Sequence, residues 1–176
     1  HNLTDVIIQM AATISKRIVS GNKLLLCGNG GSAGDAQHLA AELIVRLRSQ
    51  KNRKALPAIT LALDTSTLTA CANDFGFDKI FERTLESLGL ENDILLVIST
   101  SGNSKNIILA MKKAKKMGVN VFGFLGSGGG RAIKYCDEVF LVPSYDTGHI
   151  QESHITAGHA LVACIEDNLY ASRYLK

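Results

Sequence analysis

The fold is decided by the stretch Ile94-Leu95-Leu96-Val97-Ile98-Ser99-Thr100-Ser101-Gly102-Asn103-Ser104, where an apolar run turns abruptly into hydroxyl-bearing residues around a glycine. A strand that is apolar at every position is typical of a parallel sheet covered on both faces. An earlier stretch, Leu24-Leu25-Leu26-Cys27-Gly28-Asn29-Gly30-Gly31-Ser32, has the same form. A helical pattern follows each loop. The two stretches therefore predict strand–loop–helix units of an α/β protein.

Both strand–loop–helix junctions favour the binding of an anion. The first turn of a helix presents unpaired backbone N–H groups and the positive end of the helix dipole, and short hydroxyl side chains add further donors. Phosphate is the anion that such junctions suit best. The four hydroxyls between residues 99 and 104 are also more than a plain turn requires. Two such loops in one domain predict a phosphorylated small molecule at the C-terminal ends of parallel strands.

The rest of the chain alternates between strand and helix patterns. Apolar residues repeat with helical spacing over residues 3–20, and this helix is expected to take part in oligomer packing. Ser32 and Ser104 are expected to be helix N-caps. The alternation predicts a single domain over residues 1–176, a three-layer αβα sandwich around a five-stranded parallel sheet with right-handed crossovers. The strands are expected at 23–27, 58–63, 94–98, 119–125 and 138–142, and the further helices at 32–48, 66–71, 77–88, 104–117 and 150–170.

Composition excludes several classes of protein. The 176 residues are 46% hydrophobic and 20% charged, which is typical of one globular domain with a sizeable core. A net charge of +3, six Phe, four Tyr and no Trp argue against nucleic-acid binding. No apolar run has the length of a membrane span, and no signal-peptide pattern is present. The scattered cysteines are expected to be reduced core residues, which favours the cytoplasm; they are Cys27, Cys71, Cys136 and Cys164.

The first glycine-rich loop matches the fingerprint of dinucleotide-binding proteins only in part. Residues 28–33 fit the pattern GxGxxA, but that fingerprint requires an acidic residue about 20 positions further on. The candidate, Asp64, follows too late in the chain. No Walker A sequence is present either, so no nucleotide cofactor is expected. The glycines at 126–130 are expected to form only a turn.

A second group of polar residues lies on two of the expected helices. His38 and Glu42 are four residues apart and therefore share a helix face. Gln151 and His159 lie about 80° apart around the last helix, so both can face one cavity, whereas His154 points away and is expected to be structural. Two histidines, a carboxylate and an amide suit a mixed metal site, for which zinc is a fitting ion. The same groups equally suit general acid–base chemistry.

Two other polar features have a functional and a structural interpretation. Arg46 is expected one helical turn beyond Glu42, where it can bind an anion, while the other cations of the segment 46–54 are expected to form a solvated loop. Residues 73–76, Asn-Asp-Phe-Gly, are expected to form a loop at the phosphate-binding edge of the sheet. The structural alternative for this loop is an Asx turn.

Four stretches together closely resemble the phosphoheptose isomerases, a branch of the flavodoxin-like SIS sugar-isomerase fold. They are CGNGGSAGDAQHLAAEL (27–43), NDFGF (73–77), STSGNS (99–104) and QESHITAGH (151–159). The resemblance implies an isomerase that converts D-sedoheptulose 7-phosphate to D-glycero-D-manno-heptose 7-phosphate through an enediol. It implies the first step of bacterial heptose synthesis for lipopolysaccharide or capsule. It also implies a cytoplasmic homotetramer with active sites at subunit interfaces.

The same resemblance implies roles for individual residues. Glu42 and His159 resemble the catalytic pair. The phosphate is expected at Ser32, Ser99, Ser101 and Ser104, and the sugar at Asn29, Gly30, Gly31, Asn73, Asp74, Thr100 and Gln151. One zinc ion per subunit is implied at His38, Glu42, Gln151 and His159.

Two other functions are compatible with the same fold. A non-catalytic relative that associates with the replication initiator would keep much of the phosphate loop, but the joint presence of His38, Glu42 and His159 argues against it. A sugar-phosphate-sensing module is the other alternative. Such modules usually accompany a DNA-binding domain, and no such domain is recognisable in these residues.

Overall fold

The computed structural model describes residues 3–62 and 64–175. Within these residues the strands form one five-stranded parallel sheet with the order β2-β1-β3-β4-β5, which confirms the predicted α/β class. The second strand pairs only as far as Thr60, and the end predicted for it at Leu63 lies outside the described residues. The strands are β1 (Leu24–Gly28), β2 (Ala58–Thr60), β3 (Ile94–Ser99), β4 (Asn120–Leu125) and β5 (Glu138–Leu141).

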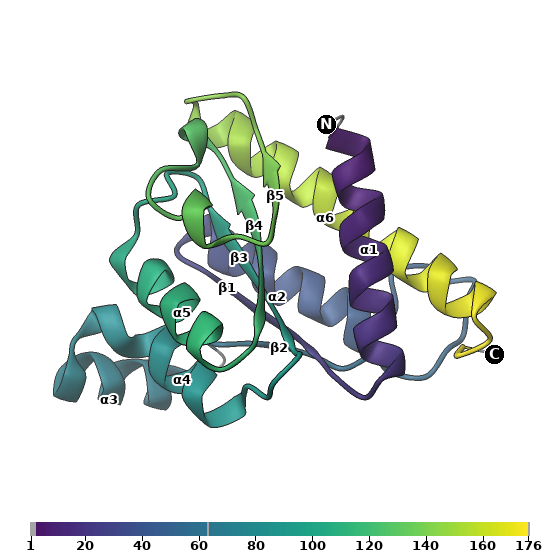
Figure 1. The fold of residues 1–176 in the computed structure, drawn as a ribbon, viewed down its shortest axis with the longest axis horizontal. Helices are drawn as coiled ribbons and strands as arrows, with labels where there is room; N and C mark the ends of the chain where they lie inside the picture. Colours follow the sequence, from purple (N-terminus) through teal and green to yellow (C-terminus); the bar gives the residue numbers. More distant parts are fainter. Residues whose placement is uncertain (1–2, 63, 176) are drawn as a thin grey trace.

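Helices cover both faces of the sheet, so the predicted three-layer arrangement is confirmed (Figure 1). In the described part of the chain they are α1 (Leu3–Val19), α2 (Gly31–Ile44), α3 (Thr65–Phe75), α4 (Ile80–Leu88), α5 (Lys105–Lys116) and α6 (Thr147–Ala171). Three short 3-10 helices connect them: η1 (Phe77–Lys79), η2 (Ser127–Gly129) and η3 (Ile133–Tyr135). None of the helices in the described ranges is long and apolar enough to cross a membrane.

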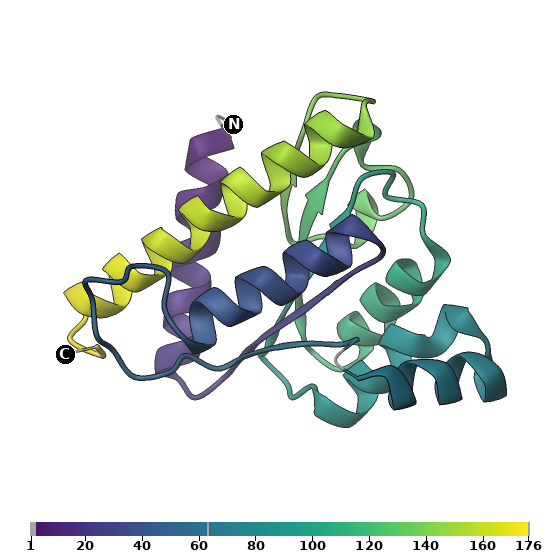
Figure 2. The same ribbon diagram turned by 180° about the vertical axis from the view of Figure 1, so that it is seen from behind.

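Two hydrophobic cores lie on opposite faces of the sheet because successive strand residues point to opposite sides. Leu24 and Leu26 of β1 pack with α1, α2 and α6. Leu25 and Cys27 pack with α3, α4 and α5 on the other side. Figure 2 shows α2 and α6 next to each other, and residues from both helices belong to the first core. The inner strands β1 and β3 are therefore buried on both faces, as their apolar sequences predict.

The ends of α2 differ from the prediction. Its N-cap is Gly30, with φ of 57°, and not Ser32, which lies buried inside the first turn. The helix ends at Ile44 and not at Arg48, because the backbone of Val45 leaves the helical region. Arg46 consequently lies beyond the helix, not on the face that carries Glu42.

The remaining boundaries differ less. α3 continues to Phe75, so Asn73 and Asp74 belong to a helix and not to the predicted loop. Gly76, with φ of 91°, ends that helix. α6 begins earlier than predicted, at Thr147, because the carboxylate of Asp146 caps it by accepting a hydrogen bond from the backbone N–H of His149. Ser104 occupies the predicted N-cap position of α5, although its side chain makes no capping bond.

The sheet order places the loops after β1 and β3 beside each other. These two strands pair in register up to Gly28 and Ile98. From β1 the chain crosses to the edge strand β2, and from β3 it crosses the other way to β4. The direction of the connections reverses between β1 and β3, and ligands of open parallel sheets bind at such a reversal, outside the carboxyl ends of the strands.

Candidate active site

The loops after β1 and β3 enclose a small polar cavity of about 70 Å³. Ser32 and Ser99 are buried beside it, and Ser104 stands at the N-terminus of α5 without using its hydroxyl to cap the helix. The four serines that the sequence assigns to phosphate therefore lie around one cavity. The lining residues are Asn29, Ser32, Ile98, Ser99, Thr100, Ser101 and Ser104. Hydroxyl donors and a helix N-terminus suit a phosphate group.

The loop after β3 is supported by the glycines that precede η3. Gly102 has φ of 63°, and a Cβ at this position would collide with the backbone carbonyl of Gly129. A Cβ on Gly130 would in turn collide with the carbonyl of Ser101. The backbone N–H of Ala132 donates to the carbonyl of Gly102 at 2.9 Å. The turn predicted at 126–130 thus packs directly against the phosphate loop.

A reciprocal amide pair joins the two phosphate loops. The side chain of Asn29 donates to Asn106 at 3.0 Å, and Asn106 donates back at 2.9 Å. Asn106 lies in the first turn of α5 and is buried. Sequence analysis missed it, although a polar residue next to the apolar Ile107 and Ile108 was a usable signal. The amide of Asn29, predicted to contact sugar, here holds β1's loop against α5.

The polar residues of α2 and α6 converge next to these loops. The Nε2 atoms of His38 and His159 lie 2.8 Å apart, and Nε2 of His38 lies 3.5 Å from a carboxylate oxygen of Glu42. One imidazole must donate this hydrogen bond and the other accept it, so the two rings have complementary protonation at Nε2. All three side chains come from one chain. This grouping can carry out proton transfer.

Two glycines let α2 and α6 approach closely at this point. A Cβ on Gly31 would collide with the side-chain amide of Gln151, which therefore lies over the first turn of α2. A Cβ on Gly158 would lie 2.7 Å from the side chain of Leu39. Gly158 directly precedes His159, and Leu39 directly follows His38. The close contact between Gly158 and Leu39 therefore keeps the two imidazoles near each other.

The donor set at this point suits zinc, because imidazole nitrogen and carboxylate oxygen are common zinc ligands. The two nitrogens at 2.8 Å are closer than the roughly 3.3 Å that separates two ligands of a tetrahedral zinc ion. Among the described residues, no three His, Cys, Asp or Glu side chains surround a common point. The donor types suit zinc, whereas the described arrangement does not bring three such ligands around one ion.

Three residues predicted to bind substrate lie elsewhere in this chain. Asn73 and Asp74 are exposed on α3, on the opposite face of the sheet from α2 and α6, and the amide of Asn73 donates to Asp74 at 2.8 Å. Arg46 is exposed beyond the end of α2. α3 is longer than its sequence pattern indicates, so Asn73 and Asp74 belong to a helix and not to a loop. α2 is shorter than its pattern indicates, so Arg46 is not on the helix that carries Glu42.

Two acidic residues near the site were missed by sequence analysis. Asp35 lies one turn before His38, and its Oδ2 is buried without a hydrogen-bond partner among the described residues. Burial raises the pKa of this carboxyl, and the nearby His38 opposes the shift. Glu166 is fully buried on α6, where it pairs with Arg53. Arg53 was predicted to be solvated, and this prediction is wrong. The usable signal was the position of Glu166 directly after the apolar Cys164 and Ile165 of the last helix.

Comparison with known proteins agrees with the fold. The family model of the SIS domain matches residues 1–126, so the chain is a SIS-domain protein. A phosphoheptose isomerase of Clostridium acetobutylicum is 52% identical over 153 residues, which cover 87% of this chain and 77% of that protein. One of Aquifex aeolicus is 49% identical over 161 residues, covering 92% and 83%. The solved phosphoheptose isomerase of Neisseria gonorrhoeae superposes with a TM-score of 0.87 at 40% identity, covering 94% and 88%. The chain belongs to the phosphoheptose isomerase family.

Proposed function

We propose that this protein is an aldose–ketose isomerase that converts D-sedoheptulose 7-phosphate to D-glycero-D-manno-heptose 7-phosphate. The observation that carries the proposal is that α2 lines a hydroxyl-rich cavity with its first turn and, further along, brings His38 and Glu42 to His159. The cavity suits the phosphate end of the substrate, and the acid–base groups suit proton transfer at its other end. A non-catalytic relative or a sensing module needs only the phosphate-binding cavity and has no need of the acid–base groups. The family membership supports the same choice.

The reaction moves one proton between neighbouring carbons. In our proposal the carboxylate of Glu42 removes a proton from carbon 1 of the ketose while the carbonyl oxygen at carbon 2 gains a proton, which gives an enediol. Glu42 then returns its proton to carbon 2, and the hydroxyl at carbon 1 loses its proton to become the aldehyde. His159 moves the proton between the two oxygens, a role that suits an imidazole near neutral pH. Anchoring the phosphate far from these atoms fixes their orientation.

We also propose one zinc ion per subunit, held by His38, Glu42, Gln151 and His159. The chemistry of these donors and the contacts of His38 with Glu42 and His159 support it. Such an ion would polarise the substrate carbonyl and stabilise negative charge on its oxygen. With or without the ion, the residues of the cavity and of the acid–base group hold and orient the substrate.

The assembly and location belong to the same proposal. We propose a cytoplasmic homotetramer in which α1 contributes to subunit packing. An apolar groove of about 550 Å³ between α1 and α6 supports such packing, because its rim includes Leu3 and Ile8, which are 39% and 54% exposed. Exposed apolar area of this kind commonly marks an interface.

The activity is tested by incubating the protein with D-sedoheptulose 7-phosphate and separating the two heptose phosphates. We expect the aldoheptose 7-phosphate to accumulate to equilibrium. Glu42→Gln keeps the size of the side chain and removes the proton acceptor, so it should leave a folded protein with no turnover. If the parent protein binds the sugar phosphate without converting it, a sensing or non-catalytic function is correct instead.

A further inference from the structure

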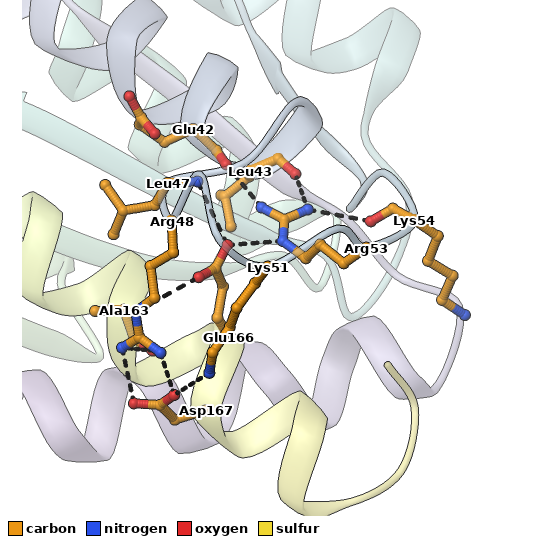
Figure 3. A network of polar contacts seen from close by, with 10 residues as sticks. All are labelled: Glu42, Leu43, Leu47, Arg48, Lys51, Arg53, Lys54, Ala163, Glu166 and Asp167. Atoms are coloured by element: carbon orange, nitrogen blue, oxygen red, sulfur yellow. Dashed lines mark hydrogen bonds and ion pairs between the residues drawn. The ribbon is translucent and has the colours of Figure 1, made fainter. Parts of the chain in front are cut away.

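Arg53 connects the end of α2 to the side of α6, the two helices that carry the proposed catalytic residues (Figure 3). Its side chain is completely buried although it comes from the basic segment after α2. Nη2 donates to the backbone carbonyl of Glu42 at 2.8 Å, and Nη1 donates to that of Leu43 at 2.8 Å. Nε donates to a carboxylate oxygen of Glu166 on α6 at 2.7 Å. One guanidinium thus binds the last turn of α2 and the side of α6.

The chemistry of a helix end explains why an arginine occupies this position. The last carbonyls of a helix have no partner within the helix, and they carry the negative end of its dipole. A planar guanidinium presents five N–H groups in a fixed fork, so it can serve two carbonyls and a carboxylate at once. A lysine ammonium is a compact charge that cannot reach all three with the same geometry.

Glu166, the residue of α6 that Arg53 binds, lies on the same helix face as His159, the proposed catalytic histidine. Glu166 follows His159 by seven residues, which places the two side chains about 20° apart around the helix and about 10 Å apart along it. Two contacts therefore join α2 and α6 at different points along their length. One is the contact between His38 and His159, and the other runs through Arg53 to Glu166. Any rotation or sliding of α6 relative to α2 moves both contacts together.

We propose that Arg53 and Glu166 are positioning residues for the isomerisation: their buried pair sets the placement of α2 against α6 and thereby the alignment of Glu42 with His159. The inference rests on the proposed function. The carbonyl that Arg53 holds belongs to Glu42 itself, so loss of this donor acts directly on the backbone that bears the proposed base. The phosphate cavity is lined by the loops after β1 and β3 and by Ser32 in the first turn of α2, about three turns before the carbonyls that Arg53 binds, and neither Arg53 nor Glu166 lines it.

A neighbouring pair provides a matched control. Arg48 binds Asp167 through two hydrogen bonds, one of them 2.9 Å long, and it also joins the segment after α2 to α6. Its guanidinium donates to the carbonyl of Ala163 on α6, and its Nε lies 3.9 Å from Oε2 of Glu166. Among the described residues Arg48 has no hydrogen bond to the carbonyls that end α2, and its main partner Asp167 is 56% exposed. Arg48→Lys therefore keeps a positive charge beside Glu166 and removes no donor from the end of α2.

The test compares Arg53→Lys with Arg48→Lys, using D-sedoheptulose 7-phosphate as the substrate. Lysine keeps the buried charge of Glu166 compensated, so Arg53→Lys should fold. We expect its kcat to fall about tenfold or more, because small misalignments of reacting groups have effects of this size, while KM changes less than about threefold. Arg48→Lys should keep both constants. A crystal structure of Arg53→Lys should show His38 and His159 further apart than in a crystal structure of the parent with the same metal content.

A second variant separates positioning from stability. Replacing both partners, as Arg53→Met with Glu166→Met, removes the buried charges together and should be more stable than Arg53→Met alone. A positioning role predicts that kcat stays low when stability returns. Recovery of kcat together with stability, or parental kcat in Arg53→Lys, would overturn the inference. If the parent does not isomerise the substrate, the proposed function fails, and the crystallographic distance still tests the positioning on its own.

Discussion

His38 and His159 are 121 residues apart in the chain, yet their Nε2 atoms lie 2.8 Å apart. The contact joins α2 to α6, and it places Glu42 and His159 of one chain at a single site. It also restricts how subunits can contribute to that site. Other residues can come from neighbouring subunits, but the proposed acid–base pair belongs to one chain.

This geometry predicts the outcome of a mixing experiment. Glu42→Gln and His159→Ala subunits would be unfolded together and refolded into mixed tetramers. Because both residues of each pair come from one chain, no mixed tetramer contains an intact pair, and we expect no activity above that of the separate variants. Refolding the parent with Glu42→Gln is the control and should give activity in proportion to the parent. Recovered activity in confirmed mixed tetramers would show that the pair is shared between chains.

The serines of the cavity are expected to hold the phosphate. Ser101→Ala and Ser104→Ala each remove one hydroxyl, and a hydrogen bond to a charged group contributes roughly 1.5–3 kcal/mol. KM for the sugar phosphate should therefore rise about tenfold or more for each variant. Ser87→Ala, at an exposed serine of α4, is the matched control and should leave KM unchanged. Unchanged KM in all three variants would place the phosphate elsewhere.

Gly158→Ala tests the close approach of α2 and α6. The added methyl group would lie 2.7 Å from the buried side chain of Leu39, so the helices must separate or Leu39 must repack. Overpacking of this kind costs about 1–3 kcal/mol of stability, and we expect kcat to fall about tenfold as His38 and His159 separate. Gly34→Ala on α2, where the new methyl meets nothing within 4 Å, should keep kcat. Equal kcat values in the two variants would contradict this expectation.

His154 should make stability depend on pH. It is fully buried against Phe124, and this burial lowers the pKa of its imidazole, while the backbone of Leu125 has a smaller, opposing effect on the pKa. The native state keeps this imidazole neutral, whereas the unfolded chain binds a proton below about pH 6.5. The free energy of unfolding should therefore fall as pH drops below that value.

His154→Phe removes this titration and keeps a ring at the position. Denaturant unfolding at pH 7.5 and pH 5.5 should show a smaller loss of stability in His154→Phe than in the parent, since the other histidines are common to both. The contribution per pH unit is at most about 1.4 kcal/mol. Identical pH dependence in the two proteins would mean that His154 is protonated equally in the folded and unfolded states.

Zinc content tests the proposed metal site. Protein purified without chelator should carry up to one zinc per subunit by elemental analysis, and His38→Ala should lower the content because it removes an imidazole ligand. His149→Ala, at an exposed histidine of α6, is the control and should keep the parental content. Full activity after chelation, in a protein that held no metal, would exclude a role for zinc.

Much of the fold, the hydroxyl-rich loops and the shared helix face of His38 and Glu42 were predictable, because they depend on the pattern of residues close together in the chain. Apolar runs such as Ile94–Ile98 predicted buried parallel strands, and the hydroxyl-rich loops after β1 and β3 predicted the place of the polar cavity. The spacing of His38 and Glu42 predicted their shared helix face. The ends of α2 and α3 were not predicted, because the backbone conformations of Val45 and Gly76 stop these helices irrespective of the side-chain pattern.

The sequence by itself determined the alternation of strands and helices, the position of the phosphate loops, and the membership of the family. Each of these depends on residues that are near one another in the chain. Only the tertiary structure decided which helix faces meet. The approach of His38 to His159, the contact of Leu39 with Gly158, and the burial of Arg53 against Glu166 all join segments more than 100 residues apart. Side-chain periodicity fixes the exposed face of one helix, but the rotation and spacing of two helices follow from how their side chains pack.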